Sequence, residues 1–133
     1  MITRLAHVTI LVRDQDEALR WYTEKLGLEK RADEKFGPGA RWLTVAPKNQ
    51  KGLEIVLQMP EPALHGEARA KPMMERIGQG TTWVFQTEDC RKEAEILKSR
   101  GVKFLRDPQQ VPRGMQAIFE DLYANTLVLL GPR

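Results

Sequence analysis

HVTILVRD at residues 7–14, followed by DEALRWYTEKLG at residues 16–27, decides the fold, because the same order of segments returns later in the chain. Residues 82–89, TWVFQTED, and residues 90–101, CRKEAEILKSRG, repeat the succession of apolar strand, charged break, amphipathic helix and glycine. Further short strand-like segments follow each copy. A unit of this size cannot bury both faces of its sheet alone, so the repeat predicts a βαβββ module written twice.

Alternation of apolar and polar residues predicts the strands of the first module and shows which side chains share a face. The opening strand is expected over residues 4–13, with His7 and Thr9 on one face. Either Asp14 or Asp16 can cap the helix that follows, and a glycine ends it. Three more strands, forming an antiparallel meander, are expected at residues 28–36, 40–46 and 53–59.

The second module follows the same plan after a segment that breaks the pattern. Prolines 60, 62 and 72 and glycines 66, 78 and 80 indicate a linker over residues 60–80, with at most a short helix near residues 73–77. A helix is then expected over residues 89–100. The remaining strands are expected at residues 102–107, 115–121 and 125–131.

These elements predict one α+β domain over residues 1–133, built of a module at 1–59, the linker at 60–80 and a module at 81–133. We expect tandem βαβββ modules that form a curved mixed sheet, shaped as a cup, with the helices outside. A ferredoxin-like sandwich does not fit, because three consecutive strands follow each helix.

Composition excludes several classes of protein. The 133 residues are 41% hydrophobic and 29% charged, which is ordinary for a globular domain. No apolar run approaches the roughly 18 residues that span a bilayer, and the first residues lack the pattern of a signal peptide, so we expect a cytoplasmic protein without membrane contact. Although the net charge is +3, acids interleave with the bases, as in residues 29–35, which argues against nucleic-acid binding.

The single cysteine, Cys90, excludes an intramolecular disulfide and suits a reducing compartment. Its position at the start of a helix could lower the pKa of its thiol. However, Cys90 is also spaced four residues before Ala94 and seven before Leu97, on the apolar stripe of that helix. We therefore expect Cys90 to belong to the core.

Three stretches, HVTILVRDQDEALRWYTEKLGL at residues 7–28, LEIVLQ at 53–58 and FEDLYANTLVLL at 119–130, resemble the vicinal oxygen chelate superfamily. This family includes glyoxalase I, bleomycin-resistance proteins and extradiol dioxygenases. The resemblance covers essentially the whole chain. It implies two paired βαβββ modules that form a cup, with a divalent metal held at its base in the enzymes by side chains from equivalent strands.

Carried over to this sequence, the resemblance implies four ligand positions, of which only two hold metal-binding side chains. His7 and Glu54 occupy the first two positions. Thr82 stands where a histidine or glutamine would be expected, and Val128 stands where a glutamate would be expected. Two protein ligands rarely hold a divalent ion tightly, so we expect no complete metal site and no cofactor. A divalent metal weakly bound by His7 and Glu54 is the alternative, completed by Gln58, Gln86 or substrate oxygens.

The expected binding residues, with or without a metal, line the concave face of the sheet. They are His7, Thr9, Glu54, Gln58, Thr82, Gln86 and Val128.

Three functions remain open at this point. The first is a metal-independent protein that binds a small-molecule ligand in the cup, as bleomycin-resistance proteins do. The second is an enzyme, a divalent-metal-dependent lyase, isomerase or dioxygenase, in which Glu54 also acts as a base. The third is a non-catalytic assembly protein with a vestigial pocket. In all three, free sheet edges favour a homodimer.

Overall fold

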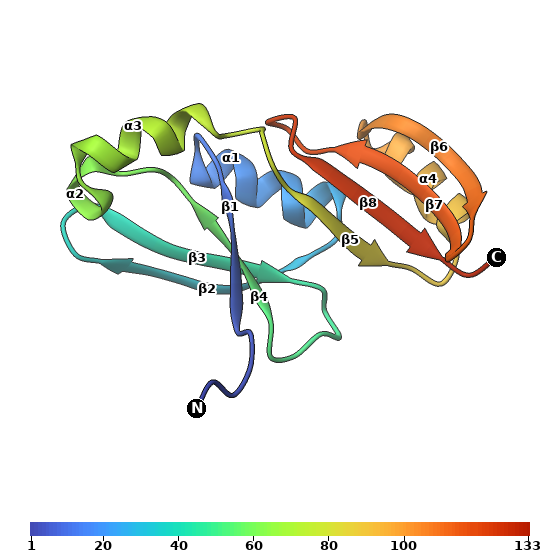
Figure 1. Ribbon diagram of the computed structural model, residues 1–133, viewed down its shortest axis with the longest axis horizontal. Helices are drawn as coiled ribbons and strands as arrows, with labels where there is room; N and C mark the ends of the chain where they lie inside the picture. The colour runs from blue at the N-terminus through green and yellow to red at the C-terminus, as the bar shows by residue number, and fades with distance from the viewer. The chain divides into compact units, whose positions relative to one another are not determined.

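The computed structural model describes residues 1–133, except for the side chain of Phe36. The chain forms two compact units, Met1–Ile77 and Gly78–Arg133, each with a four-stranded sheet (Figure 1). The first unit contains β1 (His7–Leu11), α1 (Gln15–Arg20), the π-helix η1 (Trp21–Lys25), β2 (Glu29–Phe36), β3 (Ala40–Ala46), β4 (Glu54–Gln58), α2 (Pro62–His65) and α3 (Glu67–Glu75). The second unit contains β5 (Thr82–Gln86), α4 (Cys90–Ser99), β6 (Lys103–Val111), β7 (Gly114–Glu120) and β8 (Thr126–Gly131).

The two sheets have the same topology. The strand orders are β1-β4-β3-β2 and β5-β8-β7-β6. In each sheet the first strand pairs in parallel with the last, and the other pairs are antiparallel. A parallel pair requires a crossover connection, which α1 and η1 begin in the first unit and α4 begins in the second. The prediction of an α+β fold built from two βαβββ modules is therefore confirmed.

One face of the first sheet forms a hydrophobic core with the helix that follows β1. Alternate residues of the strands are buried on this face, together with the inner side of α1 and η1: Ile10, Leu43, Val45, Ile55, Leu57, Ala18, Trp21 and Tyr22. Asp14 caps α1 by accepting a hydrogen bond from the Glu17 amide (2.9 Å), as one of the two predicted caps. The opposite face of the sheet carries no helix of the βαβββ module.

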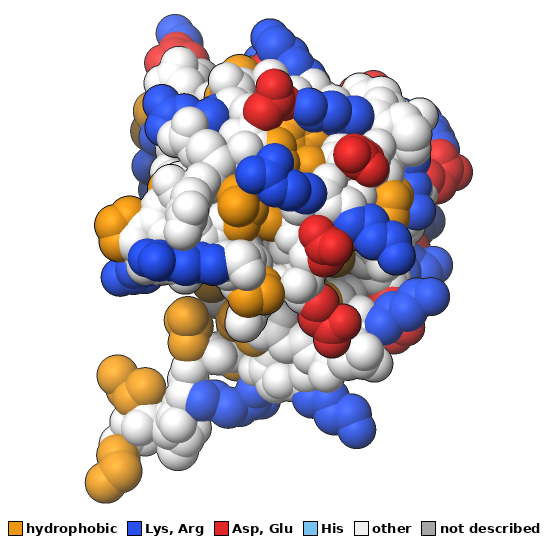
Figure 2. Space-filling view, turned by 90° about the vertical axis from the view of Figure 1, so that its right-hand side faces the viewer, with side chains coloured by type: hydrophobic (Ala, Val, Ile, Leu, Met, Phe, Trp, Pro, Cys, Tyr) orange, Lys and Arg blue, Asp and Glu red, His pale blue; other side chains and the backbone are white. Residues whose placement is uncertain are grey.

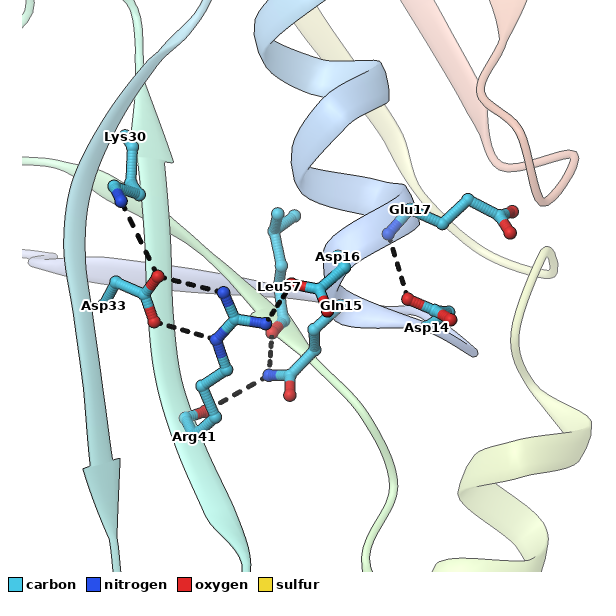
Figure 3. A network of polar contacts seen from close by, with 8 residues as sticks. All are labelled: Asp14, Gln15, Asp16, Glu17, Lys30, Asp33, Arg41 and Leu57. Atoms are coloured by element: carbon cyan, nitrogen blue, oxygen red, sulfur yellow. Dashed lines mark hydrogen bonds and ion pairs between the residues drawn. The ribbon is translucent and has the colours of Figure 1, made fainter.

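A polar network attaches α1 to this sheet (Figure 3). The guanidinium of Arg41 on β3 donates two hydrogen bonds to Asp33 on β2 (2.8 and 2.9 Å) and one to Asp16 on α1 (2.8 Å). The Gln15 amide donates to the backbone carbonyls of Arg41 (3.1 Å) and Leu57 (2.8 Å). The hydrogen bonds from Arg41 lower the pKa of the Asp33 carboxyl.

The second unit buries the equivalent face of its sheet under α4. Cys90, Ala94 and Leu97 form the inner stripe of the helix, and Phe119 and Leu127 lie beneath it. Cys90 is buried in this core, as predicted, and its burial raises the pKa of the thiol.

The segment between the modules is more helical than the sequence predicted. We expected at most a short helix near residues 73–77, and the structure instead has α2 over Pro62–His65 and α3 over Glu67–Glu75. Ala70, Met73 and Ile77 are buried at helical spacing, and that apolar stripe outweighs the helix-breaking tendency of Pro72 inside α3.

Gly78, the first residue of the second unit, packs closely against the turn between β7 and β8. The Gly78 amide donates to the Asn125 side chain (3.1 Å), whose own amide donates to Asp121 (2.9 Å). Gly78 has φ +84°, and a Cβ atom there would collide with the carbonyl oxygen of Tyr123. Since both the backbone angle and the space exclude a side chain, glycine is required at this position.

The sheet edges differ in charge. The edge strands β2 and β6 carry many charged residues and register shifts, and β6 also contains Pro108, all of which discourage pairing with another strand. By contrast, β1 (HVTIL) and β5 (TWVFQ) contain no lysine, arginine, aspartate or glutamate. These two edge strands therefore lack the charges that discourage pairing.

The described helices all fall short of the length and apolarity that a membrane-crossing helix needs. On the face shown in Figure 2, Lys and Arg side chains alternate with Asp and Glu side chains, so bases and acids are interleaved there.

We predict that Asp33→Asn lowers the free energy of unfolding by about 1 kcal/mol at pH 7. The substitution removes the charged carboxylate whose two oxygens accept hydrogen bonds from Arg41. Since the pKa of Asp33 is lowered in the folded state, its stabilisation is present above the unfolded value of about 4 and is lost as the pH falls below it. Urea unfolding from pH 7 to pH 2 measures this, and the difference between variant and wild type should disappear at the acidic end. Asp107→Asn, which removes an exposed partner of Lys98, is the control and should have a smaller effect. A difference that persisted unchanged at pH 2 would contradict this prediction.

Candidate functional site

The face of the first sheet opposite α1 carries a small group of polar and aromatic side chains. Strand pairing places His7 on β1 directly beside Glu54 on β4. Thr44 on β3 pairs with Val56, two residues beyond Glu54, so Thr44 lies on the same face. Trp42 precedes Thr44 by two residues and therefore shares this face as well. We call it the open face of the first unit.

A directed chain of hydrogen bonds holds the Glu54 carboxylate. The Ala32 amide of β2 donates to Thr44 Oγ1 (3.0 Å), and the Thr44 hydroxyl donates to Glu54 Oε1 (2.7 Å). The register of β2 and β3 shifts between Lys30 and Ala32, which directs the Ala32 amide to a side chain. Because Thr44 is fully buried, both of its hydrogen bonds are made away from water.

His7 completes the group at the edge strand. Its Nε2 atom lies 3.8 Å from Glu54 Oε1, and the side chains of His7 and Glu54 are 43% and 30% exposed. The imidazole meets the Trp42 ring edge to face, with the ring centroids 5.1 Å apart and the planes at 69°. The open face therefore combines a carboxylate, an imidazole and an indole, all partly accessible to solvent.

The other predicted residues of the first unit belong to the same face but make fewer contacts with this group. Thr9 pairs with Val56, and Gln58 pairs with Leu11. The Gln58 amide donates to the carbonyl of Met59 (2.9 Å), so it is turned toward the backbone. Thr44 was missed by the sequence analysis, although its spacing of two residues from Trp42 already placed both on one face.

In the second unit, the predicted residues lie on the equivalent face of the sheet, and β5 pairs with β8 in the same register as β1 with β4. Thr82 pairs with Thr126, whereas Val128 pairs with Val84. In the first unit His7 pairs with Glu54. The repeat thus makes Thr126 the counterpart of Glu54, and Val128 lies two residues further along the strand.

A backbone contact confirms this equivalence of the two repeats. The Val12 amide donates to the Gln58 carbonyl in the first unit, and the Thr87 amide donates to the Leu130 carbonyl in the second, both at 2.9 Å. Gln58 follows Glu54 by four positions, and Leu130 follows Thr126 by the same number. Where the first unit presents imidazole and carboxylate, the second therefore presents two hydroxyl groups.

A hollow of about 670 Å³ opens where β5 and β8 end in the second unit. It is lined by Gln86, Thr87, Glu88, Arg113, Leu130, Gly131 and Pro132. Gln86 was predicted as a binding residue, but Glu88 and Arg113, which give the rim charges of opposite sign, were not. Arg113 lies in the turn between β6 and β7, and no pattern in the sequence relates that turn to the end of β5.

The metal-binding side chains on the open face of the first unit are too few to hold a divalent ion tightly. His7 and Glu54 supply one nitrogen and one carboxylate, and Glu54 Oε1 already accepts the Thr44 hydroxyl. Stable sites usually use three or four protein ligands. Across the described residues, no three His, Cys, Asp or Glu side chains are placed to hold one metal ion. The arrangement is instead suited to hydrogen bonding with a molecule that lies against the sheet.

Comparison with known proteins agrees with this fold. The sequence profile of the Glyoxalase/Bleomycin resistance protein/Dioxygenase superfamily matches residues 4–129. YetH, an uncharacterised protein of Bacillus subtilis (strain 168), is 33% identical over 129 residues, which are 97% of this chain and 98% of YetH.

Two solved structures extend the comparison. UcmS2 is 40% identical, with a TM-score of 0.86 over 97% of this chain and 98% of its own. TnmS3, an antibiotic binding protein from Streptomyces sp. CB03234, is 29% identical, with a TM-score of 0.81 over 99% of this chain and 98% of its own. With the match to the family profile along almost its whole length, the chain belongs to the Glyoxalase/Bleomycin resistance protein/Dioxygenase superfamily, as its resemblance to the vicinal oxygen chelate proteins predicted.

Proposed function

We propose that this protein binds a small organic molecule on the open face of the first unit and does so without a complete metal site. The observation that carries the proposal is the group formed by His7, Glu54, Thr44 and Trp42, in which a carboxylate is held in place by a buried hydroxyl. A few fixed polar groups on an otherwise apolar surface are typical of small-molecule sites.

The hollow in the second unit also supports this function. Its volume of about 670 Å³ lies within the range of about 300–1,000 Å³ that is usual for small-molecule sites. Gln86, Glu88 and Arg113 supply polar groups at its wall, and Leu130 and Pro132 supply apolar surface.

The similarity to TnmS3 also supports a binding function. TnmS3 is described as an antibiotic binding protein, and it matches this chain along almost the whole length of both proteins. Since a shared fold alone does not fix function, the side chains of the open face carry the proposal and the similarity to TnmS3 supports it.

We further propose that the protein acts as a homodimer in the cytoplasm. The uncharged edges of β1 and β5 leave backbone groups available for pairing, and Val84 on β5 is 55% exposed, which a second copy would cover. A single buried cysteine is consistent with a reducing compartment.

We predict that compounds which bind in a fragment screen by ligand-observed NMR will shift backbone amides of β1 and β4. Glu54→Ala should weaken such binding about fivefold or more, because a hydrogen bond to a charged group is lost. Glu24→Ala, which removes a carboxylate from η1 on the exposed side of the helix, is the matched control and should leave affinity unchanged. Shifts concentrated around α1 or α4, or a screen without any binder, would contradict the proposed function.

We predict that Thr9→His raises the affinity for Zn²⁺ at least about tenfold, as measured by calorimetry, because it adds a third ligand beside His7 and Glu54 on one face. Thr9→Val is the control and should not change the affinity. In the Thr9→His background, His7→Ala should remove the gain. Wild-type protein that already holds a stoichiometric metal ion after purification would contradict the prediction.

We predict a sedimentation mass of about twice the 15.2 kDa of one chain at micromolar concentration. Val84→Lys should shift the mass toward the monomer by placing an unpaired charge in the contact. Leu105→Lys is the matched control, since Leu105 is similarly exposed (51%) but lies on the charged edge strand β6, and it should leave the mass unchanged. A monomer mass that did not rise on concentrating would exclude the dimer.

A further inference from the structure

The hydrogen-bond chain on the open face has a direction. Thr44 Oγ1 accepts the Ala32 amide hydrogen, and the hydroxyl hydrogen is donated to Glu54 Oε1. Glu54 is therefore the acceptor at the end of the chain. Both contacts have ordinary hydrogen-bond lengths, 3.0 and 2.7 Å, and Thr44 is fully buried, so water does not compete for its hydroxyl.

The second oxygen of the carboxylate is the one left for a ligand. Among the described residues, Glu54 Oε2 makes no hydrogen bond, and no lysine or arginine pairs with Glu54. Its side chain is 30% exposed on the open face, and His7 Nε2 lies 3.8 Å from Oε1. A carboxylate accepts hydrogen bonds and donates none when it is ionised, so this oxygen offers a fixed acceptor.

The surroundings of this acceptor favour a flat molecule. The rings of Trp42 and His7 meet edge to face beside Glu54, and aromatic ligands pack well against such surfaces. We propose that Glu54 selects aromatic ligands that carry a hydroxyl group as hydrogen-bond donor, and that Thr44 is the positioning residue that keeps Glu54 in the accepting orientation. This inference rests on the proposed function and adds to it the chemical class of the ligand.

Two probes that differ only in the donor test the selection. 2-Naphthol carries a hydroxyl group, and 2-methoxynaphthalene has the same rings without a donor. NMR titration of the wild-type protein, followed at the Trp42 indole N–H, should show about tenfold tighter binding of 2-naphthol. Equal affinity for the two probes, or binding of neither at millimolar concentration, would overturn the inference.

Substitution of Glu54 tests the acceptor itself. In Glu54→Gln the amide oxygen is expected to accept the Thr44 hydroxyl, which turns the NH₂ group, a donor, toward the ligand. The preference for 2-naphthol should therefore vanish or reverse in this variant. An unchanged tenfold preference would show that Glu54 is not the selecting group.

Substitution of Thr44 separates a positioning role from a structural one. Thr44→Val removes the hydroxyl and should reduce the preference to about twofold, whereas Thr44→Ser keeps the hydroxyl and should retain it. Thr23→Val is the matched control, because the Thr23 hydroxyl also makes a 2.7 Å hydrogen bond, to the Leu19 carbonyl in the helix. It should leave the preference unchanged.

Stability and selection are measured separately in these variants. Thr44→Val also leaves the Ala32 amide without its partner, so urea unfolding is recorded beside each titration. If Thr44→Val remains folded and discriminates between the probes as well as Thr44→Ser does, the positioning role is excluded. If fragments bind the open face but the naphthalene pair is not discriminated, the inference fails while the proposed function stands.

Discussion

The parallel pairing between the first and last strand of each unit is the constraint on which the rest of the structure depends. It brings His7 beside Glu54 in the first unit and Thr82 beside Thr126 in the second, although these residues lie far apart in sequence. Because side chains alternate along a strand, this single register decides which residues face the helix and which face the open side. A shift by one residue would exchange the hydrophobic core with the polar group.

The helix face supplies the rigidity that the open face needs. Leu57 and its buried neighbours pack under α1, and Arg41 and Gln15 connect the helix to β2, β3 and β4 through charge-assisted and backbone hydrogen bonds. The strands that carry Glu54 and Thr44 are thus held from behind. A site built on fixed strands keeps its polar groups in place before a ligand arrives, which lowers the entropic cost of binding.

The two repeats have diverged in chemistry while keeping their backbone. The open face of the first unit holds the imidazole of His7 and the carboxylate of Glu54. The equivalent positions of the second unit hold Thr82 and Thr126. Hydroxyl groups are weak ligands for divalent metals but good partners for organic molecules. The asymmetry supports the proposal that the protein recognises a small molecule by hydrogen bonds and aromatic contacts.

The sequence by itself determined the order of elements, the faces of the strands, the core position of Cys90 and the presence of only two metal-binding side chains at the expected positions. These follow from short-range periodicity and residue type. Tertiary structure alone decided that Thr126 is the counterpart of Glu54, that Thr44 orients the carboxylate, that residues 62–75 are mostly helical and that Arg113 meets the end of β5. The physical reason is that register, bulges and turn contacts are set by hydrogen bonds and packing between residues distant in sequence, which local patterns do not encode.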